Sequence, residues 1–243
     1  MGRTAIILGS SGLIGSEVLK QLLADKDSSE EIALGSSNSS LNSEKVPRPG
    51  FEKIKIFVRK PIAIKHPKLE QIIVDFDTIG NYSDSIKGDV IFCCLGTAIA
   101  AAGSKEGFIK VDHTYPLEFA KIAKQNGIKS FLLISSIGAD KTASNFYLKV
   151  KGEIEFALDE LKFESLIIIR PSMLLGDRKE FRFAESAGKV FMKLFSFAFI
   201  GKLKKYKAIE ASAVAKAMIC LSKMKIEGSA IFPSDKLQQI AER

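Results

Sequence analysis

The sequence predicts an α/β fold of the Rossmann type, a doubly wound parallel sheet with helices on both faces. Two observations lead to this prediction. An apolar run at the start of the chain ends in glycines and continues into an amphipathic helix, and further short apolar runs then alternate with helical patterns. The chain has 243 residues, of which 46% are hydrophobic, so it can bury one substantial core. We therefore expect a single domain over residues 1–243.

The first stretch, TAIILGSSGLIGSEVLKQLL, reads as a strand, a glycine turn and a helix. Gly9 permits the tight turn, Gly12 lets a pyrophosphate approach the backbone, and Gly15 lets the helix pack on the strand. The helix N-terminus offers N–H groups to phosphates. The alternative is a plain strand–turn–helix, but the position of the turn between a strand and a helix favours dinucleotide binding. The expected cofactor contacts in this turn are Gly9, Ser10, Ser11, Gly12, Leu13, Ile14 and Gly15.

The remaining elements follow from apolar periodicity. The expected strand order is 3-2-1-4-5-6, with a ligand site between the first and fourth strands, and the last apolar run allows a seventh strand at the edge. Strands are expected at 5–8, 53–58, 69–74, 89–94, 130–134, 166–169 and 229–232. Helices are expected at 13–23, around 82–86, at 111–125, 146–161 and 209–221, and in the tail from 235. The Gly/Ala-rich stretch at 98–107 is expected to be a loop, and Ser144 or Asn145 is expected to cap the helix that follows.

Two segments interrupt this pattern. Residues 27–50 are rich in Ser and Asn and are expected to form a flexible loop insertion. Residues 172–243 are expected to form a C-terminal substrate and lid portion. Within it, Ala187–Ile200 is strongly apolar and is followed by several lysines up to Lys207. A helical lid over an apolar substrate pocket is the favoured interpretation, and a peripheral contact of Ala187–Lys207 with a membrane or a protein is the alternative.

The end of the second strand indicates the cofactor. Enzymes that use NAD usually place Asp or Glu there to bind the ribose 2′-hydroxyl, whereas a cation accommodates the 2′-phosphate of NADP. Here the strand ends in Arg59 and Lys60, and Arg59 offers a planar fork to a phosphate. Both residues could instead be exposed charges before Pro61. We predict a preference for NADP(H) over NAD(H).

Two further strand ends are expected to lie beside the cofactor. The third strand ends at Asp75-Phe76, where Asp75 could accept from the adenine amino group or cap the helical turn that follows. The fourth strand is apolar throughout and ends at Leu95, Gly96 and Thr97. Loops at this edge of a parallel sheet line the ligand site.

A catalytic set is predicted from the fifth strand and the helix after it. The strand ends at Ser135 and Ser136, and Tyr147 and Lys151 are four residues apart on one helical face. Carbonyl reduction needs a proton donor and a group that holds the carbonyl oxygen. Tyrosine has an ordinary pKa of about 10, and a nearby ammonium favours its phenolate. The alternative is a solvated helix face, because Tyr-x-x-x-Lys also occurs by chance.

These residues resemble the short-chain dehydrogenase/reductase superfamily, in its atypical branch with the Gly-x-x-Gly-x-x-Gly turn. The closer likeness is to the Tat-interacting-protein-like oxidoreductases. It rests on FCCLGT at 92–97, EGFIKVDHTYP at 106–116, SSIGADKTASNFYLKVKGEIE at 135–155, LKFE at 161–164 and RPSMLLGDRKE at 170–180.

The resemblance implies NADPH binding, with Tyr147 as proton donor, Lys151 as its partner and Ser136 as the catalytic serine. It also implies cofactor contacts at the turn after the sixth strand. Members of this group are better known as NADPH-binding regulators than as enzymes with an agreed substrate. The further residues expected at the cofactor are Arg59, Ser135, Pro171, Met173 and Leu174.

Composition and charge argue against nucleic-acid binding and metal binding. The net charge of +8 fits an anionic cofactor and solvated lysines better than nucleic acid, because no nucleic-acid-binding motif is present. The two histidines and three cysteines match no zinc site, so no metal is expected. Adjacent cysteines in an apolar strand and the lack of room for a signal peptide predict a reducing, cytoplasmic location.

Two functions are therefore expected from the sequence. The first is an NADPH-dependent oxidoreductase that reduces an apolar carbonyl substrate by hydride transfer. The second is an NADPH-binding regulatory module with little or no turnover. An intact set of Ser136, Tyr147 and Lys151 favours the enzyme.

Overall fold

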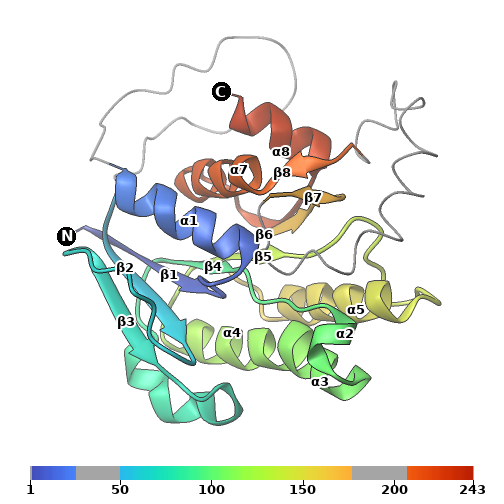
Figure 1. Cartoon of the computed structure of the whole chain (residues 1–243), viewed down its shortest axis with the longest axis horizontal. Helices are drawn as coiled ribbons and strands as arrows, with labels where there is room; N and C mark the ends of the chain where they lie inside the picture. The colour runs from blue at the N-terminus through green and yellow to red at the C-terminus, as the bar shows by residue number, and fades with distance from the viewer. Residues whose placement is uncertain (1, 26–49, 177–206, 243) are drawn as a thin grey trace.

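A computed structural model describes residues 2–25, 50–176 and 207–242. Its main sheet has seven parallel strands in the order β3-β2-β1-β4-β5-β6-β9 (Figure 1). This confirms the predicted order and the seventh strand at the edge. The strands are β1 (Arg3–Leu8), β2 (Phe51–Val58), β3 (Leu69–Ile73), β4 (Val90–Cys93), β5 (Ser130–Ile134), β6 (Ser165–Arg170) and β9 (Gly228–Pro233). A separate parallel pair is formed by β7 (Leu174–Leu175) and β8 (Ile209–Glu210).

Helices cover both faces of the sheet, as the doubly wound prediction requires. One layer contains α1, α7 and α8, and the opposite layer contains η1, α4 and α5 (Figure 1). The helices are α1 (Leu13–Ala24), the 3₁₀ helix η1 (Phe76–Ser85), α2 (Ile99–Ala102), α3 (Lys105–Ile109), the π-helical turn η2 (Lys110–Thr114), α4 (Tyr115–Gln125), α5 (Phe146–Glu160), α7 (Ala211–Lys223) and α8 (Ser234–Ala241).

The core consists of two apolar layers separated by the sheet. In β1, Ala5 and Ile7 face the α1 and α7 layer, whereas Ile6 and Leu8 face the α4 and α5 layer, and all four are fully buried. A parallel strand that is covered on both sides needs such a continuous apolar run. The central strands are therefore fixed, and their C-terminal ends can hold the polar loops of a site.

Some predicted boundaries were wrong. Residues 98–107 are not a loop, because they contain α2 and the start of α3, where Ser104 caps the helix by accepting from the N–H of Gly107. The helix expected from 111 therefore continues an earlier helix through η2. The helix expected from 209 begins two residues later, because β8 pairs with β7. Asn145, rather than Ser144, caps α5.

Two predicted segments lie outside the described residues. They are all but the last residue of the insertion at 27–50 and the apolar stretch Ala187–Ile200, with most of the lysines after it. Within the described ranges, no helix is long and apolar enough to cross a membrane.

Candidate active site

The glycine turn has the geometry expected for a dinucleotide site. Gly9 adopts φ +75°, and a Cβ there would lie 2.5 Å from the carbonyl oxygen of Cys94. A Cβ on Gly15 would lie 2.1 Å from the carbonyl oxygen of Gly9, so only glycine lets α1 start this close to β1. A Cβ on Gly12 would meet only that same oxygen, at 3.3 Å. Gly12 therefore leaves open space at the helix N-terminus.

Polar groups at this turn lack partners within the described residues. Gly12 is the N-cap residue of α1, and no side chain caps the helix. The Ser10 hydroxyl is unpartnered although the residue is only 2% exposed. A buried hydroxyl without a partner is costly, and an uncapped helix N-terminus attracts anions. These residues fit a dinucleotide diphosphate.

The loop after β4 links this turn to the predicted catalytic helix. On one side its first residues lie against Gly9, as described above. On the other side, a Cβ on Gly96 would lie 3.4 Å from Asp112 Oδ1 and 3.8 Å from Lys151 Nζ. The N–H of Thr97 donates to Asp112 Oδ2 at 2.9 Å. One loop thus joins the glycine turn and the predicted lysine at the topological switch point between β1 and β4.

Lys151 forms a buried ion pair that was not predicted. Its Nζ lies 2.7 Å from Asp112 Oδ1, and the side chains of Lys151 and Asp112 are 5% and 1% exposed. The same ammonium lies 3.4 Å from the carbonyl oxygen of Ile134. An ammonium has three donors, so among the described residues one remains after these two contacts. That donor is available to a ligand hydroxyl.

The surroundings of Lys151 keep it charged. Burial lowers the pKa of Lys151, but the nearby Asp112 carboxylate and its hydrogen bond raise it. The net pKa of Lys151 is above the ordinary value. Cys93 on β4 also faces this pair, and burial raises the pKa of its thiol to about 12. Cys93 therefore lines the site as an uncharged thiol and is not a nucleophile at neutral pH.

Tyr147 is half-buried at the start of α5, one turn before Lys151. Its ring lies 5.7 Å from the fully buried ring of Phe108 on α3, at 45°. Helix α3, which begins within the segment that was expected to be a loop, therefore packs on the phenol ring. Ser136 is partly exposed, and its hydroxyl donates to the carbonyl oxygen of Ile137 at 3.3 Å.

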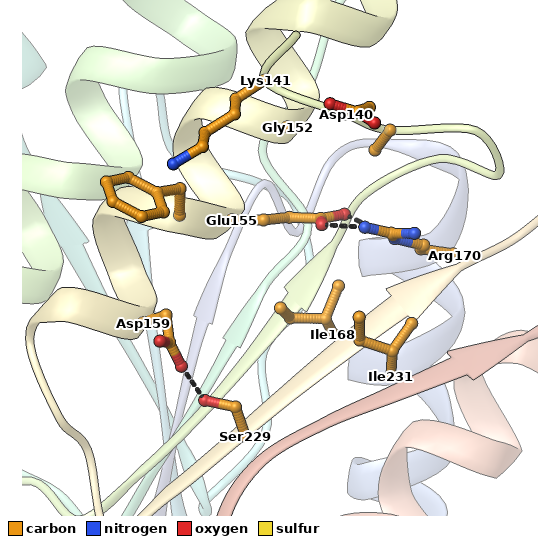
Figure 2. A pocket seen from close by; sticks show the side chains of 11 residues that line it. Asp140, Lys141, Gly152, Glu155, Asp159, Ile168, Arg170, Ser229 and Ile231 are labelled. Atoms are coloured by element: carbon orange, nitrogen blue, oxygen red, sulfur yellow. Dashed lines mark hydrogen bonds and ion pairs between the residues drawn. The ribbon is translucent and has the colours of Figure 1, made fainter. Parts of the chain in front are cut away.

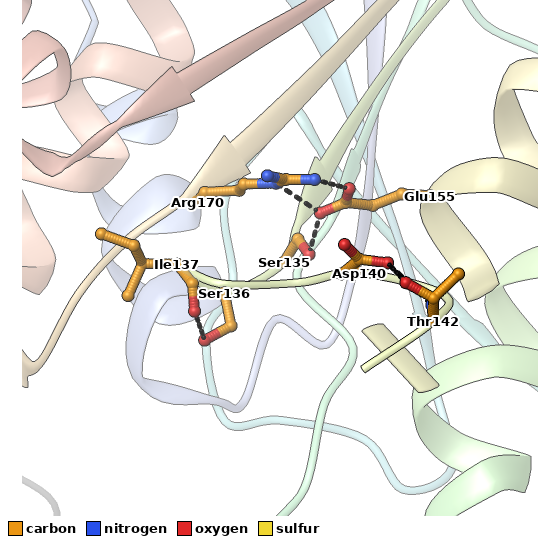
Figure 3. Close-up of polar contacts among 7 residues, drawn as sticks. All are labelled: Ser135, Ser136, Ile137, Asp140, Thr142, Glu155 and Arg170. Atoms are coloured by element: carbon orange, nitrogen blue, oxygen red, sulfur yellow. Dashed lines mark hydrogen bonds and ion pairs between the residues drawn. The ribbon is translucent and has the colours of Figure 1, made fainter. Parts of the chain in front are cut away.

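The two serines after β5 have different surroundings, as Figure 3 shows. The buried Ser135 hydroxyl donates to Glu155 Oε1, and Arg170 donates to the same carboxylate from Nε at 3.0 Å and from Nη2. Ser136 takes no part in this network. The side chain of Ser135 is thus bonded to α5, and the same carboxylate binds Arg170 of β6.

The loop after β5 also packs directly on α5. A Cβ on Gly152 would lie 2.1 Å from the carbonyl carbon of Asp140, so the loop can cross the helix only at a glycine. The N–H of Ile137 donates to the carbonyl oxygen of Pro171, which joins the turns after β5 and β6. These contacts fix Ser136 relative to the helix that carries Tyr147.

The other predicted cofactor residues lie at the same edge of the sheet or in the turns after it. Arg59 and Lys60 follow β2 directly and are exposed. The Asp75 carboxylate accepts from the N–H of Asp77, so it caps η1. The Phe76 ring packs 5.5 Å from that of Tyr115. Met173 in the turn after β6 and Leu174 at the start of β7 are partly exposed.

Two residues of this site were missed from the sequence, although helical spacing signals both of them. Asp112 lies four residues after the buried Phe108, on an inward face where a carboxylate needs a partner. Glu155 lies four residues after Lys151, in line with Tyr147.

A separate surface pocket of about 400 Å³ lies beyond α5, between that helix and β6 and β9 (Figure 2). Ile168, Ile231 and Phe156 form its apolar part. Lys141 lies over the Phe156 ring, 3.4 Å from its centre. The Glu155–Arg170 pair borders this pocket, whereas Tyr147 and Lys151 do not line it.

No family model matches the chain. Individual protein sequences do match the chain. The chain is 37% identical to protein HTATIP2 of Rattus norvegicus over 190 residues, which cover 78% of this chain and 70% of that protein. It is 36% identical to the mitochondrial protein FMP52 of Meyerozyma guilliermondii over 176 residues, which cover 72% of this chain and 66% of the relative.

The expectation of a cytoplasmic location is wrong. Several fungal relatives named FMP52 are described by that name as mitochondrial, which conflicts with a purely cytoplasmic assignment. Free cysteines are typical of reducing conditions but do not distinguish one reducing compartment from another.

The fold also matches solved structures. MoeE5, solved in complex with UDP-glucuronic acid and NAD, superimposes with a TM-score of 0.66 at 13% identity, covering 94% of this chain and 75% of MoeE5. This likeness concerns the Rossmann-like fold, whereas the HTATIP2 match is one of sequence. The chain belongs to the HTATIP2 family, the Tat-interacting-protein-like branch of the atypical short-chain dehydrogenases/reductases.

Proposed function

We propose that this protein is an NADP-dependent oxidoreductase that binds NADPH at the switch point and reduces an apolar carbonyl substrate. The observation that carries the proposal is the continuity of the site through the β4 loop. That loop contacts Gly9 of the glycine turn and lies over Lys151 of the predicted catalytic set. A diphosphate held at α1 and a ribose held at Lys151 would therefore belong to one ligand.

Each residue has a distinct chemical role in this proposal. NADPH, when bound, supplies the hydride. Tyr147 donates its phenolic proton to the carbonyl oxygen as negative charge develops there, and the Ser136 hydroxyl holds that oxygen. Lys151 uses its remaining donor to position the ribose, while the Ser10 hydroxyl and the N-terminus of α1 hold the diphosphate.

The proposal is tested by NADPH oxidation with a panel of aldehydes, ketones and quinones, comparing the wild type with Tyr147→Phe. Removal of a general acid typically costs about 10²–10⁴-fold in rate. We expect kcat to fall by about that factor while the Kd for NADPH stays within about twofold, because Phe keeps the packing on Phe108. Equal turnover in the variant would exclude Tyr147 as the proton donor.

The preference for NADPH is tested separately at the end of β2. Arg59→Ala should raise the Kd for NADPH by about tenfold or more, because a charge-assisted contact with the 2′-phosphate is lost. The Kd for NADH should change little. Lys65→Ala, which removes another exposed charge after β2, is the matched control. Equal losses for both cofactors in Arg59→Ala would contradict a phosphate contact.

A second candidate function is an NADPH-binding regulatory module. The Lys151–Asp112 ion pair favours it, because the carboxylate offsets the cation that would activate the phenol. Tight NADPH binding without turnover on the whole panel would support this function.

A further inference from the structure

The Asp112–Lys151 pair is electrically balanced and almost completely withdrawn from water. Its atoms are 2.7 Å apart, with side-chain exposures of 1% and 5%. Both groups lie under Gly96, at the loop where the nicotinamide end of a dinucleotide would pass. Charges in such a dry site act on a neighbouring ligand with little screening.

We propose that Asp112 sets the relative affinity of the protein for oxidised and reduced cofactor, by cancelling the charge of Lys151. This inference rests on the proposed NADP(H) site. NADP⁺ carries a positive charge on its nicotinamide ring, and NADPH does not. An unbalanced ammonium beside that ring would disfavour the oxidised form, whereas the neutral pair tolerates both.

The groups that face Lys151 support this assignment. Asp112 approaches from η2, Tyr147 from the preceding turn of α5, Cys93 from β4, and the Ile134 carbonyl from β5. Burial raises the pKa of Cys93 to about 12, so this thiol is neutral. Within this set Asp112 forms the ion pair with Lys151, so its carboxylate is the group placed to balance the lysine.

Asp112 is a positioning residue as well, because its second oxygen holds the N–H of Thr97 at 2.9 Å. A purely structural role would therefore also make it important. The two roles differ in one measurable quantity. Loss of positioning weakens NADP⁺ and NADPH alike, whereas loss of charge balance changes the ratio of their dissociation constants.

The experiment measures Kd for NADP⁺ and for NADPH at pH 6 by calorimetry, in the wild type, in Asp112→Asn and in Asp112→Asn/Lys151→Met. In Asp112→Asn, the Kd ratio of NADP⁺ to NADPH should rise roughly tenfold, as expected for one uncompensated charge at an effective dielectric constant of about 20. The double variant is again neutral. Its ratio should return to within about twofold of the wild type, even though both contacts are lost.

The outcomes separate this inference from the proposed function. An unchanged ratio in Asp112→Asn, or a double variant that shifts like the single one, overturns the inference while NADP(H) binding stands. If the wild type binds neither form, both proposals are overturned. Should Asp112→Asn not fold, Lys151→Met alone leaves the carboxylate uncompensated, so its ratio must move in the opposite direction. The charge-conserving Asp112→Glu must keep the wild-type ratio.

Discussion

Helix α5 carries two buried ion pairs one turn apart, and they differ in what they leave free. Lys151 and Asp112 are 5% and 1% exposed, and the ammonium keeps one unused donor. Arg170 and Glu155 are 26% and 7% exposed, and the Glu155 carboxylate accepts from Ser135 and twice from Arg170. The first pair can still bind a ligand, whereas the second uses its carboxylate to join β5, α5 and β6.

Their positions explain the difference. Lys151 lies under the β4 loop at the switch point, where ligands bind in open α/β sheets. Glu155 lies one turn further along, beside the surface pocket at β6 and β9 (Figure 2). Burial of charge therefore does not by itself indicate function in this protein. The feature that separates the two pairs is the free hydrogen-bonding capacity of Lys151 at the switch point.

The largest effect on stability is expected at the second pair. Glu155→Ala removes the acceptor of both Arg170 and Ser135, and the partly buried guanidinium loses its ion-pair partner. Breaking such a pair from one side costs about 3 kcal/mol in the free energy of unfolding. Urea denaturation measures this loss. Glu155→Gln keeps the shape and part of the hydrogen bonding, so it should lose less.

A loss below about 1 kcal/mol in Glu155→Ala, which is typical of an exposed pair, would contradict the structural role. The comparison also requires that both Glu155 variants keep their affinity for NADPH within about twofold when folded. A large selective loss of cofactor affinity would show that the two pairs are not separate in function.

The Lys151–Asp112 pair should change how the stability of the protein depends on pH. Asp112 raises the pKa of Lys151 above 10.5, so this lysine stabilises the fold at neutral pH, and the contribution is lost as pH rises through that raised pKa. In Asp112→Asn, the carboxylate no longer opposes burial, which is the largest influence on this pKa, so we expect the folded-state pKa of Lys151 to fall below the unfolded value. The unfolded chain then binds more protons, and stability rises with pH up to about 10.5.

The destabilisation caused by Asp112→Asn should therefore shrink between pH 7 and pH 10. Urea denaturation across this range measures the change. The titration of the Cys93 thiol contributes to the stability of both proteins, so it cancels in the difference between them. If the loss of stability in Asp112→Asn is the same at every pH, the pKa of Lys151 does not depend on the Asp112 charge.

The sequence predicted the fold better than it predicted the site. Local signals were sufficient for the fold, because the glycine turn and the apolar runs each report on their own strand or helix. Tyr147 and Lys151 could also be paired, since they share one helical face. The partner of Lys151 could not, because Asp112 comes from η2, a different helix whose approach to α5 depends on tertiary packing.

The two serines after β5 show the same limit at a finer scale. The sequence presents Ser135 and Ser136 as neighbours at a strand end and predicts both in the site. Which of them is held by Glu155 depends on the loop that crosses Gly152 and on the position of Glu155. Those contacts join residues that are far apart in the chain, and no local pattern reports them.

The smallest expected effect therefore gives the sharpest test of the comparison. Ser135→Ala removes one hydrogen bond to Glu155, which keeps Arg170, so stability should fall by about 1 kcal/mol with kcat unchanged. Ser136→Ala should leave stability within about 0.5 kcal/mol, because its hydroxyl makes only a local contact with Ile137, and should lower kcat on any substrate found. Thermal unfolding and NADPH oxidation measure the two quantities. A loss of kcat in Ser135→Ala without loss of stability would reverse the assignment of the two serines and, with it, the division of α5 into a ligand-binding turn and a structural one.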